Sequence, residues 1–377
     1  MRRTFRLLHL WMALTTGLLI LVVSVTGSII VYEEPLDRLI AAGFYERQST
    51  GPAPYPGTDI ALSRIIQAAK GHRPAASIIF LDFRPLPDGP VIAVMDPPSS
   101  SAVEVSIDPV SGAIIGDRSV YHVLNVIRAL HINLLAGNLG YTIIGLSGIV
   151  LLGIMGTGLY LWWPQGGKWK QALTFKKGAS PHRRNVDLHR LFGIYTLVPL
   201  LVAVVTGIIL VFPGYTIDPV LGPTRAERPT IRAADQKQSL PPDQVIPRAR
   251  QAIDHGELAL IHFPYSTGEP FYQLSFRSFE KGHPRGRSYV HVYSDNGEIR
   301  WAKATRDANF AYKLRWEWLV PTHSGDVAGH WGKIPILLSG LAPLGLMVTG
   351  LLMWLRRERS RRRSLKARSH GARSDWR

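Results

Sequence analysis

Residues 139–163 read LGYTIIGLSGIVLLGIMGTGLYLWW, and this run contains no acidic or basic side chain. A helix of about 20 predominantly apolar residues is long enough to cross the hydrocarbon core of a bilayer. Three further uncharged runs of similar length occur at about residues 7–32, 191–212 and 334–355. Helices in the core of a soluble protein rarely stay uncharged for so long, and four of them in one chain are harder still to explain. The sequence therefore predicts an integral membrane protein with a four-helix transmembrane bundle.

The basic residues are distributed unevenly around these runs. The 377-residue chain has 44 Lys and Arg against 27 Asp and Glu, a net charge of +17. Nineteen of the 44 fall in three short segments, 1–6, 164–187 and 356–377. Because Lys and Arg accumulate on the cytoplasmic side, these segments and both termini are predicted to be cytoplasmic, with 33–138 and 213–330 facing outward. Topology thus explains the charge without a nucleic-acid partner, and the basic tail is expected to touch anionic membrane lipid.

The composition also excludes several kinds of site. With no cysteine, the chain cannot form thiolate zinc sites, iron–sulfur clusters, disulfides or the covalent links of c-type haem. No Gly-x-Gly-x-x-Gly fingerprint of a nicotinamide or flavin site is present, and the cytoplasmic segments are too short to form a domain.

Two histidine spacings recur along the chain and indicate an internal duplication. A histidine precedes a Thr-Gly pair by 17 residues in two places and by 26 residues in two others. Because the two spacings recur in the same order, they predict two homologous halves, related as a parallel repeat by an axis along the membrane normal. The matching positions are His9 with Thr26-Gly27, His189 with Thr206-Gly207, His131 with Thr157-Gly158, and His323 with Thr349-Gly350.

The duplication and the uncharged runs together define the expected segments. Each half is a span, an outward domain and a second span. The boundaries are transmembrane helix 1 at 1–32, an outward domain at 33–130, an outer-face segment with transmembrane helix 2 at 131–163, a cytoplasmic loop at 164–187, transmembrane helix 3 at 188–212, a second outward domain at 213–320, an outer-face segment with transmembrane helix 4 at 321–355, and a basic cytoplasmic tail at 356–377.

Each outward domain is predicted to be a small α+β unit with an antiparallel sheet, because a helical pattern precedes several short β-rich runs separated by turns. The Pro- and Gly-rich stretches 33–57 and 214–240 are expected to be connectors. The predicted helices are 60–70 and 244–253, and the predicted strands are 77–83, 91–95, 103–107, 113–115, 258–263, 271–276, 288–293 and 298–301.

The four repeated histidines are the candidate ligands of a cofactor. A two-fold axis along the membrane normal would bring His9 opposite His189 on the inner side and His131 opposite His323 on the outer side. Two facing imidazoles in a helix bundle are what axial ligation of a b-type haem requires, so two haems are predicted. Contacts with lipid headgroups and close helix packing are the structural alternative. Separate zinc or copper sites are a further alternative, for which Asp187 lies near His189.

Three other residues are weaker candidates. His330 interrupts the repeat where Asn138 stands in the first half, and it is read as a substrate-facing residue, an alternative ligand or a surface group. Trp316 and Trp318 are expected either in an aromatic belt or in a wall that faces a substrate. The remaining outward histidines, His72, His122, His255, His262, His283 and His291, are expected at the surface.

Five motifs carry a resemblance to a known family: Leu8-His9-x-Trp11, Ala129-Leu130-His131, Thr157-Gly158-Leu159-x-Leu161-Trp162-Trp163-Pro164, Asp187-Leu188-His189-Arg190 and Thr322-His323-Ser324-Gly325. With these motifs, the chain resembles the PepSY-associated transmembrane family over nearly its whole length. The resemblance implies that both outward domains are PepSY-like, that the protein lies in a bacterial inner membrane, and that His9, His189, His131 and His323 bind haem in pairs. Within this family the chain is most similar to ferrioxamine-type siderophore reductases.

The expected function is transmembrane electron transfer that reduces a ferric siderophore in the periplasm and releases Fe(II). The protein would then be an oxidoreductase acting on metal ions, with a quinol or a cytoplasmic reductase as its electron donor. Two other functions stay open. One is a PepSY-type regulatory or binding protein without redox activity, and the other is a siderophore importer, against which the uncharged spans argue.

Overall fold

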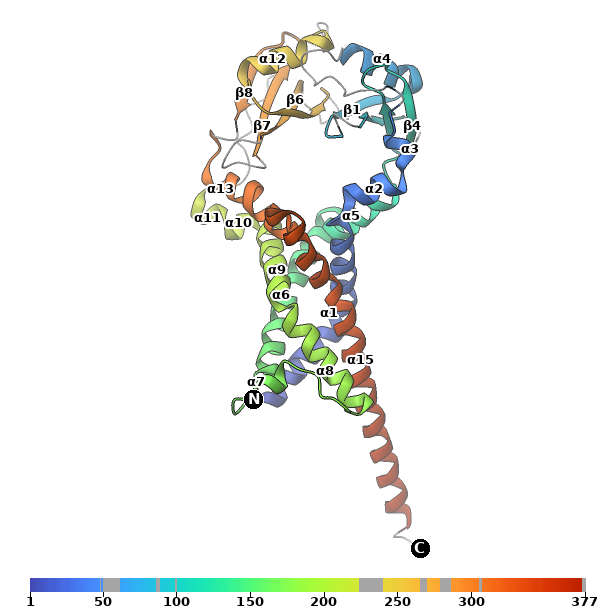
Figure 1. Cartoon of the computed structure of the whole chain (residues 1–377), viewed down its shortest axis with the longest axis vertical. Helices are drawn as coiled ribbons and strands as arrows, with labels where there is room; N and C mark the ends of the chain where they lie inside the picture. Colours follow the sequence, from blue (N-terminus) through green and yellow to red (C-terminus); the bar gives the residue numbers. More distant parts are fainter. Residues whose placement is uncertain are drawn as a thin grey trace. The chain divides into compact units, whose positions relative to one another are not determined.

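The protein divides into two compact units, which are described separately below. The computed structural model describes residues 1–47, 49, 62–85, 89–98, 100–223, 240–264, 270–278, 286–304 and 307–374. The helical unit comprises Met1–Val31, Ile127–Phe212 and Val320–Arg377. The sheet unit comprises Tyr32–Val126 and Pro213–Leu319. Figure 1 labels many of the elements of both units.

Three helices of the helical unit are long and apolar enough to cross a membrane. They are α1 (Arg2–Ile30), α6 (Gly137–Trp162) and α15 (Gly329–Ser374). Each covers nearly all of one predicted apolar run, so the structure has a long apolar helix at each of these three places. Helix α15 continues beyond its apolar part into the basic tail without a break.

The third predicted run is divided between two helices instead of forming one straight span. Helix α8 (Pro181–Tyr195) and helix α9 (Leu197–Val211) meet at Thr196 with a bend of 55°. Pro199 explains the bend, because a proline removes one backbone donor and its ring crowds the carbonyl four residues earlier. The Thr196 hydroxyl caps the end of α8 by donating to the Phe192 carbonyl at 2.6 Å. The pair counts as a fourth span only if its two parts cross the membrane together.

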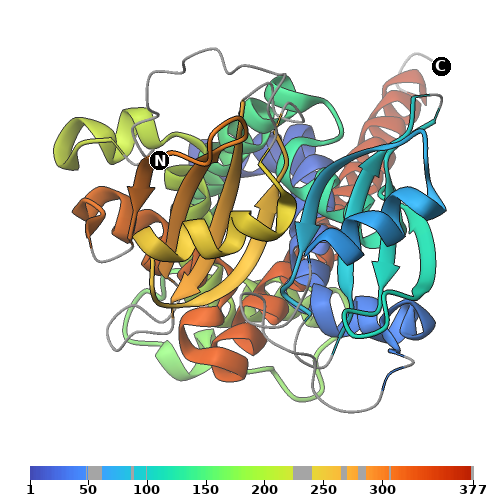
Figure 2. The ribbon, with the colours of Figure 1, turned by 90° about the horizontal axis from the view of Figure 1, so that it is seen from above.

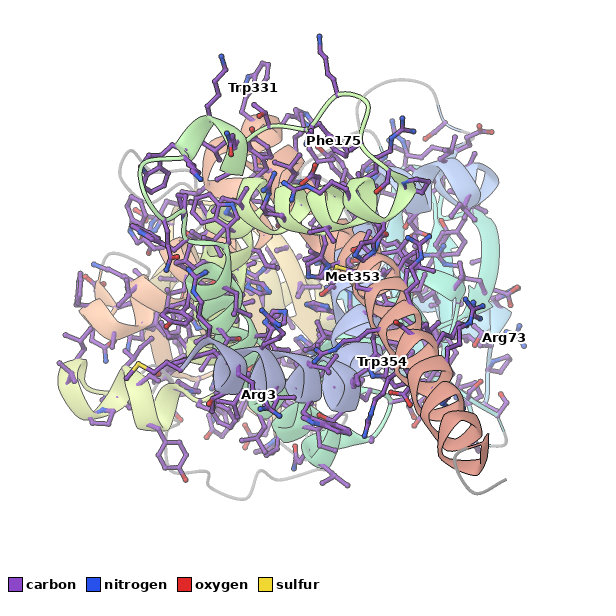
Figure 3. All side chains as sticks on the ribbon, turned by 90° about the horizontal axis from the view of Figure 1, so that it is seen from below. Arg3, Arg73, Phe175, Trp331, Met353 and Trp354 are labelled. Atoms are coloured by element: carbon purple, nitrogen blue, oxygen red, sulfur yellow. The ribbon has the colours of Figure 1, made fainter. Side chains whose placement is uncertain are left out.

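The long helices pack side by side within the helical unit. Helix α1 packs against α6 and α15, and the α8–α9 pair packs against the same two helices. Helices α1 and α8 therefore lie diagonally opposite each other, as the end-on view in Figure 3 shows. Shorter elements complete the unit: α5 (Val123–Asn133), α7 (Trp169–Ala172), α14 (Val320–Ser324) and η4 (Asp326–Ala328).

The interior of the helical unit consists mostly of small and hydroxyl-bearing side chains, and many large apolar side chains point outward. Ser28 is 3% exposed and donates to the Leu337 carbonyl at 3.0 Å, whereas Leu18 is 70% exposed. This distribution suits a lipid environment, in which helices associate through close packing and polar contacts instead of through hydrophobic burial. The other buried hydroxyls are Thr26, Ser147, Thr157, Thr206, Ser339 and Thr349.

The sheet unit contains one continuous antiparallel sheet of eight strands, in the order β4-β3-β2-β1-β5-β6-β7-β8. The first strand of each half, β1 and β5, pair at the centre with Leu81 opposite Ile261. The antiparallel sheets predicted for the two outward segments are thus joined edge to edge, so that neither β1 nor β5 is an open edge. The strands are β1 (Ser77–Asp82), β2 (Val91–Asp96), β3 (Val103–Ile107), β4 (Ile114–Ser119), β5 (Glu257–His262), β6 (Phe271–Ser278), β7 (Gly286–Tyr293) and β8 (Ile299–Lys303).

One face of this sheet is covered by helix α4 (Leu62–His72) and helix α12 (Val245–Ala252), which lie side by side over it in Figure 2. Ile65 and Val245 are fully buried and share a single apolar core with Leu81 and Ile261 of the sheet. The core therefore runs continuously beneath both helices and across the junction between β1 and β5.

The connectors are partly helical, which the Pro- and Gly-rich composition did not predict. Within 33–57 the chain forms α2 (Glu33–Ile40) and α3 (Ala42–Tyr45). Within 214–240 it forms most of α10 (Pro213–Thr216) and all of α11 (Asp218–Leu221), and residues 48, 50–61 and 224–239 lie outside the described residues. The remaining helices are η1 (Pro242–Gln244), α13 (Phe310–Lys313) and the π-helical turn η3 (Leu314–Leu319).

Candidate functional site

The four repeated histidines form two facing pairs inside the helical unit. The ring centroids of His9 on α1 and His189 on α8 lie 6.4 Å apart, with an interplanar angle of 85°. The ring centroids of His131 on α5 and His323 on α14 lie 6.1 Å apart, with an angle of 41°. The structure thus brings together the partners that the repeat predicted.

The Nδ1 atoms of the first pair are held by equivalent backbone carbonyls. His9 Nδ1 lies 3.1 Å from the Ile154 carbonyl oxygen in α6. His189 Nδ1 lies 3.1 Å from the Leu346 carbonyl oxygen in α15. Since a carbonyl oxygen can only accept, Nδ1 must carry the proton in both rings.

The second pair is held in the same way from the other two helices. His131 Nδ1 donates to the Val23 carbonyl in α1 at 2.9 Å, and His323 Nδ1 donates to the Ala203 carbonyl in α9 at 2.9 Å. All four rings therefore have the same tautomer, which leaves the lone pair on Nε2. Among the described residues, no hydrogen bond engages any of these four Nε2 atoms.

The Thr-Gly pairs that marked the repeat lie directly against the imidazoles. The threonine hydroxyl oxygen lies within hydrogen-bond distance of Nδ1 in three of the four places: Thr157 to His9 at 3.0 Å, Thr349 to His189 at 2.9 Å, and Thr206 to His323 at 3.1 Å. The hydroxyl of Thr26 instead donates to the Val22 and Val23 carbonyls. The sequence contained this signal, but only the structure shows that these residues support the histidines.

The glycine of each Thr-Gly pair leaves the space that the ring occupies. A Cβ atom on Gly27 would lie 2.7 Å from Cε1 of His131, which is too close for any carbon pair. At Gly158, Gly207 and Gly350 the corresponding distances to the facing ring are 3.2, 3.1 and 3.3 Å. Glycine is thus required at position 27, and at the other three it permits the close approach of an imidazole.

The spacing of the pairs fits axial ligation of one metal ion by two imidazoles. A metal–imidazole bond is about 2.0 Å long, and a ring atom lies about 1.1 Å from the centroid of a ring with bonds of about 1.35 Å. Two imidazoles on opposite sides of one ion should therefore have centroids about 6.3 Å apart. The observed 6.4 and 6.1 Å agree with this value. With Nδ1 occupied and Nε2 available, the residues present fit a bis-histidine haem.

A zinc or copper site beside His189 does not fit the structure. Asp187 is fully buried, but its carboxylate pairs with Arg183 and Arg190, both at 3.1 Å, and accepts from the Lys176 backbone N–H. Within the described ranges, no group of three or more potential metal-ligating His, Cys, Asp or Glu residues occurs. Asp187 instead fastens the loop before α8 to that helix.

The three weaker candidates are divided between the two units: Trp316 and Trp318 belong to the sheet unit, and His330 belongs to the helical unit. Trp316 and Trp318 lie on the π-helical turn η3 and are 36% and 55% exposed. Residues two apart on a helical turn do not face each other, so these two indoles do not line one surface. His330 lies exposed in the first turn of α15. A substrate-facing role for any of the three stays a prediction.

A buried ionic network in the sheet unit was not predicted. Arg118 on β4 donates to Asp37 on α2 at 2.7 and 2.8 Å and to Glu104 on β3 at 2.8 Å. The Tyr45 hydroxyl donates to Asp37 at 2.5 Å, and His122 lies 3.8 Å from Glu104 and 4.0 Å from Asp37. These groups attach α2 and α3 to the sheet, and no local sequence pattern distinguishes them.

The network changes the ionisation of its members. Burial would raise the pKa of Asp37, but hydrogen bonds from Arg118 and Tyr45 outweigh it and hold that pKa below its usual value. Burial, followed by the charge of Arg118, lowers the pKa of His122. Since His122 is half-buried among these charges, the prediction that it is a surface group is wrong.

The prediction of a surface position is wrong for His291 as well. Its ring is 5% exposed and stacks on Phe271 with centroids 4.0 Å apart, while Trp301 lies 4.5 Å away. The aromatic neighbours that bury this histidine come from the strands on either side of β7, Phe271 from β6 and Trp301 from β8.

The fold and the sequence together define a membrane protein with an antiparallel α+β unit. The family model described as the PepSY-associated TM region matches residues 6–357, and the chain belongs to this family. No curated protein matches the chain.

Proposed function

We propose that this protein is a di-haem b electron-transfer protein of the bacterial inner membrane that reduces ferric siderophores on its outer side. The observation that carries the proposal is the pair of imidazole spacings, 6.4 and 6.1 Å, with Nδ1 of every ring held by a carbonyl. A haem bound between each pair would supply one-electron redox chemistry.

The residues of this chain would hold and tune that cofactor. Donation from Nδ1–H to a carbonyl fixes the orientation of each ring and raises the basicity of Nε2. A more basic ligand favours the ferric state and lowers the reduction potential, which suits a donor to a ferric chelate. Tight packing of the Thr-Gly pairs against each ring limits its movement.

We also propose that α8 and α9 form one bent span, which gives a four-helix transmembrane bundle with both termini in the cytoplasm. The density of Lys and Arg in 1–6, 164–187 and 356–377 supports this orientation. The contacts of His9 with Thr157-Gly158 and of His189 with Thr349-Gly350 support a parallel duplication, because the same motif supports the same ring in each half.

Reduction would release the iron because Fe(II) carries less charge than Fe(III) and is held less strongly by anionic oxygen ligands. The electron would pass from the inner pair, His9 and His189, to the outer pair, His131 and His323. The ferric chelate would be bound on the periplasmic side, where the two PepSY-like halves of the sheet unit are proposed to lie.

The test is direct. Purified protein should contain two haems per chain, and a ferric siderophore should reoxidise dithionite-reduced protein while a ferrous chelator traps Fe(II). The variant H323A should slow this reoxidation. Reoxidation no faster than in a buffer control would exclude the reductase function, and protein without haem would exclude electron transfer altogether.

The two other functions make different predictions. A PepSY-type regulatory or binding protein would lack haem, and its four histidines could be replaced without spectral change. A siderophore importer would accumulate labelled siderophore in vesicles without releasing Fe(II). The paired imidazoles favour electron transfer over both.

A further inference from the structure

The whole net charge of the chain is carried by one end of the helical unit. Residues 1–6, 164–190 and 356–374 contain 19 of the 44 basic residues but two of the 27 acidic ones. The other 25 basic and 25 acidic residues balance each other. The surplus of +17 is therefore local, and the three segments that carry it are called the basic end below.

The two acidic residues at the basic end are already neutralised. Asp187 is fully buried against Arg183 and Arg190. Glu358 lies within 3.8 Å of Arg361 and 3.1 Å of Arg362 on the same helix. By contrast, the basic side chains Lys168, Lys170, Lys176, Lys177, Arg183, Arg184 and Arg361–Arg363 are exposed.

Hydrogen bonds hold two of the three segments of the basic end, 1–6 and 164–190, in place. The Arg2 guanidinium donates to the Trp163 carbonyl at 3.4 Å, which joins the start of α1 to the end of α6. Arg190 donates to the Gln171 and Thr174 carbonyls at 2.8 and 3.0 Å, which fastens the loop to α8. Figure 3 views this end, with Arg3 on α1 and Phe175 in the loop before α8.

The charge also extends along α15 beyond its apolar run. Helix α15 runs unbroken through Arg363, eight residues beyond the end of the uncharged run at Leu355. At 1.5 Å per residue this is about 12 Å, whereas the headgroup layer on one side of a bilayer is about 5–8 Å thick. Arg361–Arg363 therefore lie at or beyond the headgroups, although they are still within the about 15–20 residues of a span end over which basic residues influence topology. Arg361 and Arg362 are 73% and 75% exposed there, so a soluble anionic partner can reach them.

The basic end is adjacent to the inner histidine pair. Arg6 precedes His9 by one helical turn, and Arg184 precedes His189 by five residues. Thr349, whose hydroxyl oxygen contacts His189 Nδ1, is followed two turns later by Arg356. A partner docked on the basic end would thus lie close to this pair.

We propose that the basic end docks a soluble, acidic one-electron carrier protein, which supplies the electron to the inner histidine pair. This inference rests on the proposed function and on the cytoplasmic orientation of this end. One electron would pass from the reduced carrier, which is thereby oxidised, to a ferric haem held by His9 and His189, without bond formation or proton transfer by this chain. Complementary charge would steer the encounter and make it sensitive to salt.

Binding of purified flavodoxin, an acidic flavoprotein, tests the docking without relying on haem. The protein is placed in nanodiscs of uncharged lipid, and the dissociation constant is measured at low and high salt for K176E/K177E and R361E/R362E. The matched control is K70E/R287E, which reverses two exposed charges in the sheet unit. We expect at least about tenfold weaker binding for the two basic-end variants and little change for the control.

Two results would overturn the proposal. One is that the wild type does not bind flavodoxin in a salt-sensitive way, and the other is that all three variants bind flavodoxin equally well. A basic end that binds only vesicles containing anionic lipid would likewise overturn it in favour of a lipid contact. Dithionite reduces haem without a docked partner protein. If all variants bind haem and dithionite reduces it, the proposed function therefore stands even when the docking proposal fails. Loss of haem in the wild type would instead exclude the proposed function.

Discussion

His9 and His189 lie on diagonally opposite helices, yet their ring centroids are 6.4 Å apart. Each ring is held by the helix next to its own: His9 by the Ile154 carbonyl of α6, and His189 by the Leu346 carbonyl of α15. The two rings are therefore oriented independently of each other. The loss of one should remove a ligand without displacing the other.

Single replacements of the four histidines should separate the two sites. H9A or H189A should lower the haem content from two to one per chain and leave the outer site intact, and H131A or H323A should do the reverse. Haem is quantified by pyridine haemochrome, and the remaining low-spin site is identified by electron paramagnetic resonance. H330A serves as the control. If one of the four variants retains both haems, that histidine is not a ligand.

Gly27→Ala should disturb the outer site by steric contact alone. The added Cβ would lie 2.7 Å from Cε1 and 3.0 Å from Nδ1 of His131, so the ring must move. We expect loss of the outer low-spin signal, or a marked change in it, while the inner signal persists. The control is Gly156→Ala in α6, where the added atom meets nothing within 4 Å. Equal spectra for both variants would contradict the assigned packing.

Thr349→Val should raise the reduction potential of the inner site. The hydroxyl oxygen lies 2.9 Å from His189 Nδ1, and its loss makes the imidazole a weaker donor while the Leu346 carbonyl keeps the ring in place. A hydrogen bond worth about 1 kcal/mol corresponds to a shift of about 40 mV for one electron. Potentiometric titration measures the shift, with Thr15→Val as an exposed control. A lowered potential would argue against this account of the hydroxyl.

The sheet unit should lose stability as the pH falls below about 6.5, the ordinary pKa of histidine. Because the folded-state pKa of His122 is lowered, the unfolded chain takes up a proton first, and acidification favours unfolding. The folded-state pKa of Asp37 is also lowered, and that of Asp108 is lowered to about 2. Protonation of these two carboxylates on unfolding therefore causes a further loss of stability below about pH 4.

Thermal unfolding of the full chain between pH 7.5 and 5 tests this dependence. His122→Asn should flatten the profile in this range, and His182→Asn, at an exposed position in the loop, should leave it unchanged. A profile that is the same for wild type and His122→Asn would show that His122 does not contribute.

Reporter fusions should place Lys177 and Asp295 on opposite sides of the membrane. Lys177 lies in the basic loop before α8, and Asp295 follows β7 in the sheet unit. A cytoplasmic reporter is expected to be active at Lys177 and a periplasmic reporter at Asp295. The same side for both fusions would refute the proposed topology.

Sequence by itself determined the features that depend on local composition and spacing. Uncharged runs of about 20 residues identify spans because no other residue is needed to make them insert into lipid. The strands from 77 to 107 were predicted to within a residue or so at each end, because alternation and turn residues act locally. The repeated spacing of His and Thr-Gly also paired His9 with His189 and His131 with His323 before any coordinates were considered.

The tertiary structure alone decided features that depend on distant neighbours. The junction of β1 with β5 joins strands about 180 residues apart, and nothing in either strand specifies its partner. The role of Thr157 and Thr349 emerges only when α6 and α15 pack against α1 and α8 and bring each hydroxyl to an Nδ1 atom. The network of Asp37, Arg118 and His122 likewise consists of charges from separate elements that burial makes interdependent. Electrostatic and packing energies depend on distance in space, and the order of residues along the chain does not contain that distance.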